Sequence, residues 1–267
     1  MIDLHSHYLS GVDDGASNSE QSLAMIAQAS ELGITGLLAT PHATDLVDET
    51  MGNQFLERFE QTQNLVQRKN IDIRLYLGSE LFFSPRIYDW LRKPWATFNN
   101  NRKYFLFELP LLDLPEKVDH FIFQCRLEGL MPIMAHPERY IFLHKKKDRI
   151  IKWREQGCLF QINAGSIIGV FGKSVQRMAM YMLKNGFVQF VASDAHNINN
   201  RSYKVLEDAH GFLQDKLSGD DLNRLFVENP WKSIVGEDVS DIEALSEQNK
   251  TGGWMQVTNY FKRWIGD

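Results

Sequence analysis

The chain has 267 residues, a formal net charge of −5 and a pI near 5.9, a length that suits one large α/β barrel or two ordinary domains. The mild acidity gives no reason to expect nucleic acid or an anionic membrane as the main partner, although bound metal ions would still allow a phosphorylated substrate. Two cysteines make no disulfide framework, the start lacks a signal peptide pattern, and no apolar run approaches the ~20 residues that span a bilayer, so we expect a soluble cytoplasmic protein.

Short runs with strand character alternate with longer amphipathic stretches. Ser17, with Glu20 three residues later, predicts a capping box at the start of the first helix. Gly129 and Gly186 are expected to end two of the later helices. The helices are predicted at about 20–32, 55–69, 116–128 and 173–185, and from 194 to about 227. The strands are predicted at 2–5, 34–40, 73–80, 104–109, 131–136, 159–163 and 188–193.

Repeated alternation of strand and helix predicts a parallel sheet, and seven units without a break favour a closed or nearly closed barrel. The predicted strands are rich in Ile, Leu, Val and Phe, which indicates burial on both faces. We therefore expect an α/β fold, a distorted TIM-like barrel of seven strand–helix units, over residues 1–237. A polar linker is expected at 238–253, followed by a short aromatic tail at 254–267.

Histidines and carboxylates stand at the ends of six of the seven predicted strands. In a parallel barrel these ends share one face, where the loops build the active site. Each residue alone has an ordinary explanation as a cap or an ion-pair partner, but six strands that place such groups at one end indicate a site for divalent metal ions. The residues are His5, His7, His42, Glu80, Glu108, His136, Asp194 and His196.

Six motifs carry a family resemblance. They are Asp3-Leu4-His5-Ser6-His7, Val12-Asp13-Asp14-Gly15, Thr40-Pro41-His42, Gly78-Ser79-Glu80, His136-Pro137-Glu138-Arg139-Tyr140 and Ala192-Ser193-Asp194-Ala195-His196-Asn197. In this order they resemble the polymerase-and-histidinol-phosphatase (PHP) superfamily, and within it the manganese-dependent bacterial protein tyrosine phosphatases of capsule and exopolysaccharide operons. The resemblance covers roughly residues 1–235.

The resemblance implies a centre of two or three divalent ions at the carboxyl ends of the strands, with Mn²⁺ favoured and Fe, Zn, Co or Mg also allowed. One ion would take His5, His7, Glu80 and Asp194; a second Glu80, Glu108 and His136; a third Asp14, His42 and His196. It further implies a phosphotyrosine protein as substrate, typically the tyrosine-rich tail of an autokinase that controls polysaccharide export.

The expected mechanism uses a water that the ions activate to attack phosphorus in line. Arg139 and Arg201 are the candidates for binding the phosphate oxygens, because planar guanidinium groups suit phosphate. A Cys-dependent phosphatase would carry an arginine at the sixth position after its nucleophile. Met131 and Ala164 stand six positions after the two cysteines, so a covalent cysteine route is excluded.

Substrate class is less firmly indicated by the residues themselves. Tyr8, Phe82, Phe83 and Tyr140 lie near the predicted mouth and would either flank an aromatic phosphoester or pack in loops. The alternatives are a histidinol-phosphate or other small-molecule phosphatase, an amidohydrolase-like deacylase, which the two arginines disfavour, and a non-catalytic metal-binding regulatory module.

The tail is aromatic at helical spacing. It would either pack back on the barrel or dock on a membrane surface or a membrane-bound kinase. The residues that set this pattern are Trp254, Val257, Tyr260, Phe261, Trp264 and Ile265.

Overall fold

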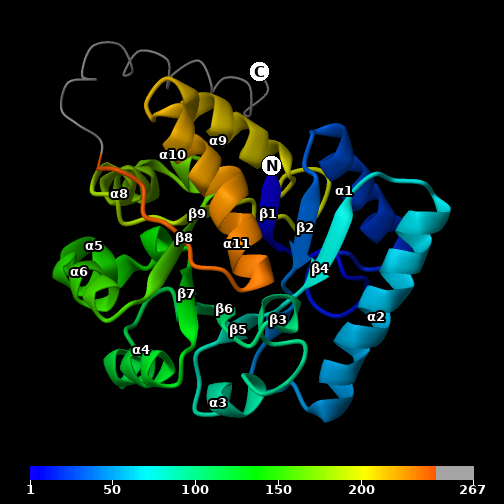
Figure 1. Cartoon of the computed structure of the whole chain (residues 1–267), viewed down its shortest axis with the longest axis horizontal. Coiled ribbons are helices and arrows are strands. Elements are labelled where there is room, and N and C mark those ends of the chain that lie inside the picture. The colour runs from blue at the N-terminus through cyan, green and yellow to red at the C-terminus, as the bar shows by residue number, and fades with distance from the viewer. Residues whose placement is uncertain (245–267) are drawn as a thin grey trace.

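The computed structural model describes residues 1–244, and the predicted aromatic tail lies outside this range (Figure 1). All strand pairs in it are parallel and form two sheets. The first sheet has the order β1 (Ile2–Ser6), β2 (Gly36–Ala39) and β4 (Arg74–Leu77). The second has the order β3 (His42–Ala43), β5 (Glu80–Phe82), β6 (Tyr104–Glu108), β7 (Met131–Ala135), β8 (Leu159–Asn163) and β9 (Phe190–Ala192).

The two sheets follow one another around a distorted ring. β2 runs on into β3 across Pro41, which has no N–H for the ladder, and β4 runs on into β5. On the other side, β1 meets the segment after β9 through a single parallel bridge between Ser6 and Ala195, where the His7 N–H donates to the Ala195 carbonyl at 2.8 Å. The seven predicted strands are therefore present, two of them broken in the middle, and their carboxyl ends lie on one side of the ring.

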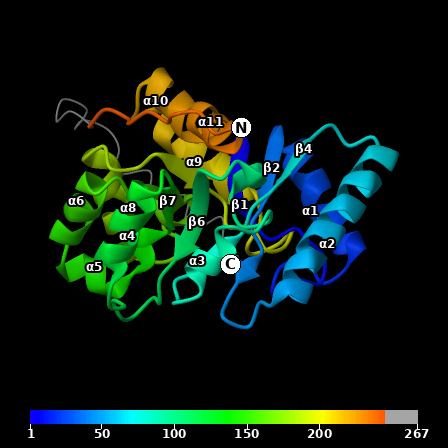
Figure 2. The same cartoon turned by 60° about the horizontal axis from the view of Figure 1, so that its bottom comes forward.

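The helices lie outside the strands (Figures 1 and 2). α9, α10 and α11 gather beside the N-terminus, whereas α1 and α2 flank β2 and β4. The helices are α1 (Ser19–Glu31), α2 (Glu49–Arg68), α3 (Ile87–Trp90), α4 (Val118–Leu127), α5 (Ile141–Lys145), α6 (Asp148–Glu155), α7 (Ala164–Ile167), α8 (Lys173–Lys184), α9 (Lys204–Gln214), α10 (Gly219–Asn223) and α11 (Asn229–Val235). Short turns η1 (Phe98–Asn100), η2 (Pro137–Arg139) and η3 (Arg224–Glu228) complete the set, η3 being π-helical.

The core has two parts, which the strand alternation separates. A small cluster within the ring includes Leu4, Leu106 and Ile133, and a larger one fills the space between strands and helices. On β8, Phe160 and Ile162 belong to the larger cluster, so the residues between them face the interior of the ring. Strands buried on both faces explain why these runs read as continuously apolar.

Several predicted boundaries need correction. The cap of α1 is Asn18, whose side chain accepts from two N–H groups of the first turn, whereas Ser17 contacts the Gln21 side chain; the predicted capping box is wrong. α2 begins six residues earlier than predicted, because Asp48 caps it through the Met51 N–H. After residue 193 the helices begin at 204 and continue to 235. Gly129 and Gly186 both follow helices with positive φ, as predicted.

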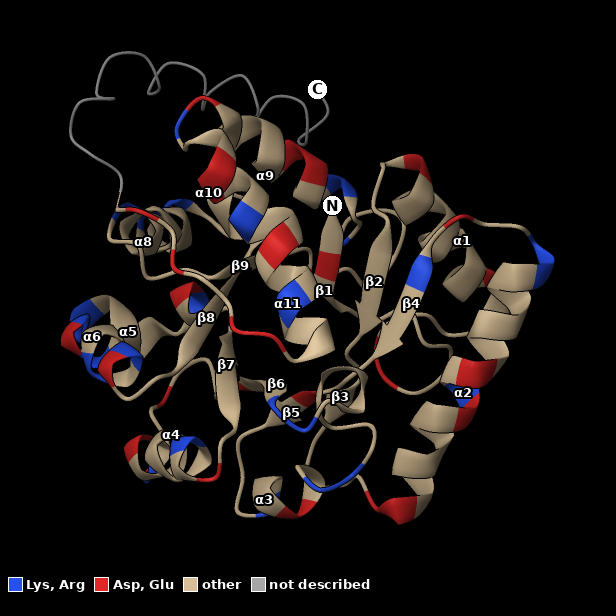
Figure 3. Cartoon of the chain, in the orientation of Figure 1, with Lys and Arg blue, Asp and Glu red and all other residues tan. Residues whose placement is uncertain are grey.

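Charged residues of both signs are mixed along the outer helices, as α2 and α6 show (Figure 3). Between residues 1 and 244, no helix is both long and apolar enough to cross a membrane. Beyond α11, residues 238–244 run against the barrel without regular structure. Asp241 there accepts hydrogen bonds from Arg154 and Gln189, both at 2.7 Å.

Candidate metal centre

The nine ligand-type residues come together at the carboxyl ends of the strands, with Glu80 in the middle. Glu80 Oε2 lies 2.9 Å from His5 Nε2 and 3.1 Å from His42 Nδ1. Its other oxygen lies 3.0 Å from His136 Nε2, and Glu108 Oε1 lies 3.5 Å from His42 Nδ1. The elements β1, β3, β5, β6 and β7 therefore each bring at least one nitrogen or oxygen atom to the same spot.

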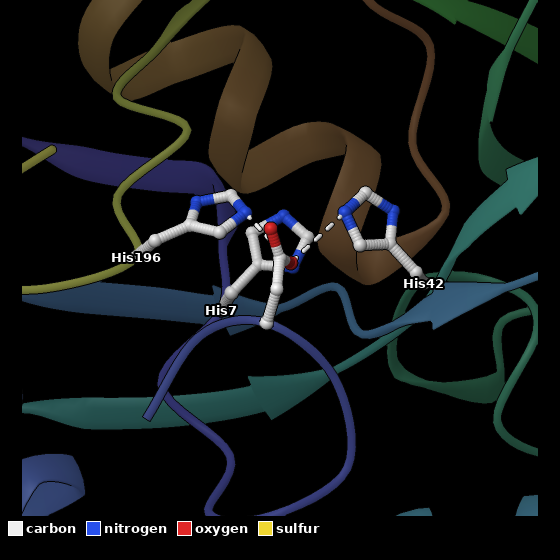
Figure 4. Close-up of side chains that lie close together, drawn as sticks. His7, His42 and His196 are labelled. Carbon is white, nitrogen blue, oxygen red and sulfur yellow. Dashed lines mark ion pairs between the residues drawn. The ribbon is translucent and has the colours of Figure 1, made fainter. Parts of the chain in front are cut away.

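The other half of the cluster is built around Asp14 and Asp194. Asp14 Oδ1 lies 3.2 Å from His196 Nε2 and 3.4 Å from His42 Nε2. Asp194 Oδ1 lies 3.6 Å from the Nε2 atoms of both His5 and His7. Figure 4 shows the rings of His7, His42 and His196 facing a common centre, with ion pairs dashed.

Hydrogen bonds behind the rings direct one nitrogen of each inward. His7 Nδ1 donates to Asp13 Oδ2 at 2.7 Å, His5 Nδ1 contacts Gln161 Oε1 at 2.9 Å, and His196 Nδ1 contacts the Asp194 carbonyl oxygen at 3.0 Å. A neutral imidazole that donates from Nδ1 presents its lone pair at Nε2, as metal ligation requires. Nε2 of His7 and of His196 are buried and have no hydrogen-bond partner in the described chain, so this donor set fits divalent ions.

The electrostatics of the cluster favour added positive charge. Burial by itself lowers the pKa of His5, but Glu80 and Asp194 outweigh it and raise that pKa. Burial by itself raises the pKa of Glu80, but His5 and His42 bring it well below its usual range. His196 differs: burial, and then the charge of His7, lower its pKa to about 4. Crowded carboxylates thus stay ionised only beside cations, either protonated histidines or metal ions.

Backbone strain marks two of these residues. His136 directly follows β7, and Asp194 lies two residues after β9. Their φ angles are 35° and 57°, a left-handed conformation uncommon outside glycine. Close packing marks the loop after β1. Gly15 approaches His7 so tightly that a Cβ placed there would lie 2.0 Å from the His7 carbonyl oxygen. The Val12-Asp13-Asp14-Gly15 turn is therefore fitted against the ligand that it helps to orient.

Both predicted phosphate-binding arginines contact the cluster through Asp194. Arg139 Nη1 donates to Asp194 Oδ2 at 3.2 Å, and Arg201 Nη2 donates to Oδ1 at 3.1 Å. The Arg139 guanidinium also stacks on the ring of Phe171, 4.7 Å from its centroid. Both side chains are partly exposed, so they reach the cluster from its solvent side.

Of the two roles considered for the aromatics, packing is the one found for Tyr8 and Tyr140. Tyr8 and Tyr140 are fully buried, and their hydroxyls donate to the carbonyl oxygens of Tyr76 and Ala135. Phe82 and Phe83 are half-buried. Sequence reasoning also missed Asp13, Gln161 and Asn163, which contact predicted ligands; Asp13 stood within a recognised motif, but nothing in the sequence marked the two amides.

Three subsets have ligand atoms that all lie within 4.8 Å of one another: His7, Asp14, His42 and His196; His5, His7 and Glu80; and His42, Glu80 and Glu108. The subset around Asp14 is the set predicted for the third ion with His7 added. The subset of His5, His7 and Glu80 is the set predicted for the first ion without Asp194. The subset of His42, Glu80 and Glu108 is the set predicted for the second ion with His42 in place of His136.

Residues 1–235 match the family model for capsular polysaccharide synthesis, CpsB/CapC. The chain belongs to the CpsB/CapC family. It is 30% identical to the tyrosine-protein phosphatase YwqE of Bacillus subtilis over 229 residues, 86% of this chain and 89% of that protein. It is 28% identical to the tyrosine-protein phosphatase CpsB of Streptococcus pneumoniae over 242 residues, 89% of this chain and 99% of that one. The family expected from the motifs is thereby confirmed.

Solved structures share the fold of this chain. A crystal structure from the work on YwqE of Bacillus subtilis and CpsB of Streptococcus pneumoniae, described as metal-dependent tyrosine phosphatases, superimposes with a TM-score of 0.82 at 28% identity, covering 92% of this chain and all of that one. Dihydropyrimidinase from Brevibacillus agri, with a TM-score of 0.51 at 13% identity over 91% of this chain and 72% of its own, shares the fold alone. The expected α/β fold with parallel strands is confirmed.

Proposed function

We propose that this chain is a metal-dependent protein tyrosine phosphatase that needs no covalent cysteine intermediate. The observation that carries the proposal is the convergence of nine ligand-type side chains on one spot, with Arg139 and Arg201 bound to the same carboxylate at its edge. The relatives named tyrosine-protein phosphatase support the reaction class, a phosphoric monoester hydrolysis.

The metal-binding residues and the two arginines have different roles in the proposed reaction. When bound, divalent ions would lower the pKa of a water to supply the nucleophile and would polarise the phosphoryl group. Two or three ions fit the subsets of ligand atoms. Imidazole and carboxylate donors accept Mn²⁺, Fe, Zn or Co, and we favour Mn²⁺ because of the resemblance to the manganese-dependent phosphatases. Glu80 holds the rings of three histidines together, and the two arginines bind and orient the phosphate oxygens.

The thiols take no part. Cys125 and Cys158 are buried, and burial raises the pKa of Cys125 to about 12 and that of Cys158 well above its usual value. A thiolate nucleophile requires the opposite shift and an exposed sulfur. Hydrolysis without a covalent intermediate is the route that the site supports.

The substrate we propose is phosphotyrosine on a protein, most simply a bacterial tyrosine kinase that controls capsule or exopolysaccharide synthesis. Two similarities support this substrate. The matching family model is described as capsular polysaccharide synthesis, and the relatives are named tyrosine-protein phosphatases. We propose the cytoplasm as the location of this chain, as its sequence led us to expect.

The test is hydrolysis of a phosphotyrosine peptide by metal-stripped full-length protein, with and without Mn²⁺. Turnover should appear only with metal and should fall at least ~10³-fold in His136→Ala, because the change removes a nitrogen 3.0 Å from Glu80 Oε1. His120→Ala, on the exposed face of α4, is the matched control and should keep full activity.

Histidinol phosphate and p-nitrophenyl phosphate are assayed beside the peptide. A higher kcat/KM on histidinol phosphate would replace the tyrosine phosphatase by a small-molecule phosphatase. Tight Mn²⁺ binding with no turnover of any phosphoester would instead support a non-catalytic metal-binding module.

A further inference from the structure

Strand β8 contributes none of the nine predicted ligands, yet two of its polar side chains are fully buried at the site. Gln161 and Asn163 are 0% exposed and alternate with Phe160 and Ile162 of the outer core, so both face the interior of the ring. A buried amide is tolerated only when its hydrogen bonds are made. The partners of these two amides are therefore informative.

The two amides form a continuous chain of hydrogen bonds between two predicted ligands. His5 Nδ1 meets Gln161 Oε1 at 2.9 Å, and Gln161 Nε2 meets Asn163 Oδ1 at 2.9 Å. Asn163 Nδ2 then meets Asp194 Oδ2 at 2.8 Å. Asp194 also accepts from Arg139 on the same Oδ2 and from Arg201 on Oδ1, as an ionised carboxylate does.

The donors and acceptors in this series of hydrogen bonds can be arranged in only one direction. A carboxylate only accepts, so Asn163 must turn its NH₂ group toward Asp194 and its oxygen toward Gln161. Gln161 must then donate to Asn163, which leaves its own oxygen toward His5. His5 must therefore carry a proton on Nδ1. Its Nε2 lies 2.9 Å from Glu80 Oε2, which also only accepts, so the metal-free ring carries a proton on both nitrogens and a bound ion would take the place of the Nε2 proton.

We propose that Gln161 and Asn163 are positioning residues that fix the tautomer of His5 by relaying the acceptor character of Asp194 along β8. The proposal rests on the metal centre proposed above, to which it adds the two groups that prepare its most deeply buried histidine. Asn163 acts at a distance, since it touches Asp194 and Gln161 and has no hydrogen bond with His5.

The end of β8 is well suited to this role because it is held firmly. The Asn163 N–H donates to Glu138 Oε1 at 3.0 Å, and the Ser166 hydroxyl donates to the same oxygen at 2.6 Å. Positions fixed on a strand keep donors and acceptors closer to their required geometry than loop positions do.

The experiment compares Asn163→Leu and the double variant Gln161→Glu/Asn163→Leu in the full-length chain. Two readouts are used: the ¹⁵N signals of the His5 ring in protein loaded with diamagnetic Zn²⁺, where an ion occupies the Nε2 side, and the Kd for Mn²⁺. Asn163→Leu should let Gln161 rotate, populate both tautomers of His5 and weaken Mn²⁺ binding roughly 10- to 100-fold. The carboxylate that Gln161→Glu introduces can only accept from His5 and needs no help from position 163, so the double variant should restore the Nδ1–H tautomer and most of the affinity.

Gln189→Met is the matched control, because Gln189 is an equally buried glutamine whose partners, the Phe160 N–H and Asp241, lie away from the cluster. It should lower the melting temperature without changing the His5 signals. Should Asn163→Leu fail to fold, Gln161→Met gives the same tautomer test.

An unchanged His5 tautomer in Asn163→Leu, or no recovery in the double variant, would overturn the relay. The NMR readout involves no phosphoester, so the relay can stand or fall independently of tyrosine phosphatase activity.

Discussion

Gly15→Ala tests the site with a single added methyl group and removes no ligand. A Cβ atom added at residue 15 would lie 2.0 Å from the His7 carbonyl oxygen and 2.6 Å from His7 Cβ. The same carbonyl accepts the Ala16 N–H at 3.0 Å, and the Gly15 N–H donates to Asp13 Oδ1 at 2.9 Å. The methyl group therefore pushes directly against the backbone of a predicted ligand and against the turn that orients its ring.

The magnitude follows from that distance. Contacts below 3.0 Å are essentially never seen for a real Cβ, so the turn and His7 must separate by about 1 Å. Overpacking of this kind costs about 1–3 kcal/mol of folding free energy. Displacing His7 and its contact with Asp13 should weaken Mn²⁺ binding at least tenfold, which corresponds to about 1.4 kcal/mol.

The assay is a calorimetric Mn²⁺ titration together with thermal unfolding. Gly211→Ala is the control, because that glycine lies within α9 with nothing within 4 Å of its built Cβ, and the change should stabilise the chain by about 0.5–1 kcal/mol. If Gly15→Ala binds Mn²⁺ as tightly as the parent chain does, then the close approach to His7 is not what holds this ligand, and the reasoning fails.

Two further predictions concern the arginines and the pH dependence. Arg139→Lys keeps the charge but loses the planar guanidinium group and its stacking on Phe171. The kcat/KM on a phosphotyrosine peptide should therefore fall roughly 10- to 100-fold with the Mn²⁺ content unchanged. The control is Arg149→Lys on α6, which should keep full activity because Arg149 binds Asp119 away from the site. In the metal-free chain, burial lowers the pKa of His7, but Asp13 and Glu80 outweigh it and raise it well above its usual value. A raised folded-state pKa stabilises the fold below pH ~6.5 and loses that effect as pH rises through the folded-state pKa, whereas metal binding requires deprotonated histidines. The gain in melting temperature on adding Mn²⁺ should therefore grow from about pH 5.5 to about pH 8, and a gain that is flat or shrinks over this range would contradict the prediction.

Eight of the nine predicted ligands could be found from the sequence because each lies at or just after the end of a recognisable strand, whereas Asp14, in the loop after β1, came only from the family resemblance. His136 and Asp194 illustrate this: the apolar runs before them fix which end of the barrel they occupy, even though their left-handed backbone could not be foreseen. Glu108 likewise ends β6 on the same side. The alternation of strands and helices in the sequence is sufficient to place these residues, because parallel strands run in the same direction and their carboxyl ends lie at one end of the barrel.

The supporting amides were not predictable in the same way. Gln161 sits between Phe160 and Ile162 in a run that reads as an ordinary buried strand. Its partner His5 is 156 residues away in the sequence, so only the closure of the ring brings the two together. For Tyr8 the sequence left two roles open, flanking the substrate or packing, and only the folded chain shows that it packs in the core.

The predicted ligands differ in solvent exposure, so the site has a buried floor and a solvent-exposed opening. His5 and Glu80 are 0% and 1% exposed, whereas His42 and Asp14 are 29% and 63% exposed. At the opening, water can complete the shell of a bound ion and compensate for small errors in ligand placement. At the floor the rings have no contact with bulk solvent, so hydrogen bonds from protein groups set the orientation of each ring. This difference explains why the hydrogen-bond chain through Gln161 and Asn163 ends on His5, the most deeply buried of the predicted ligands, rather than on a ligand at the rim.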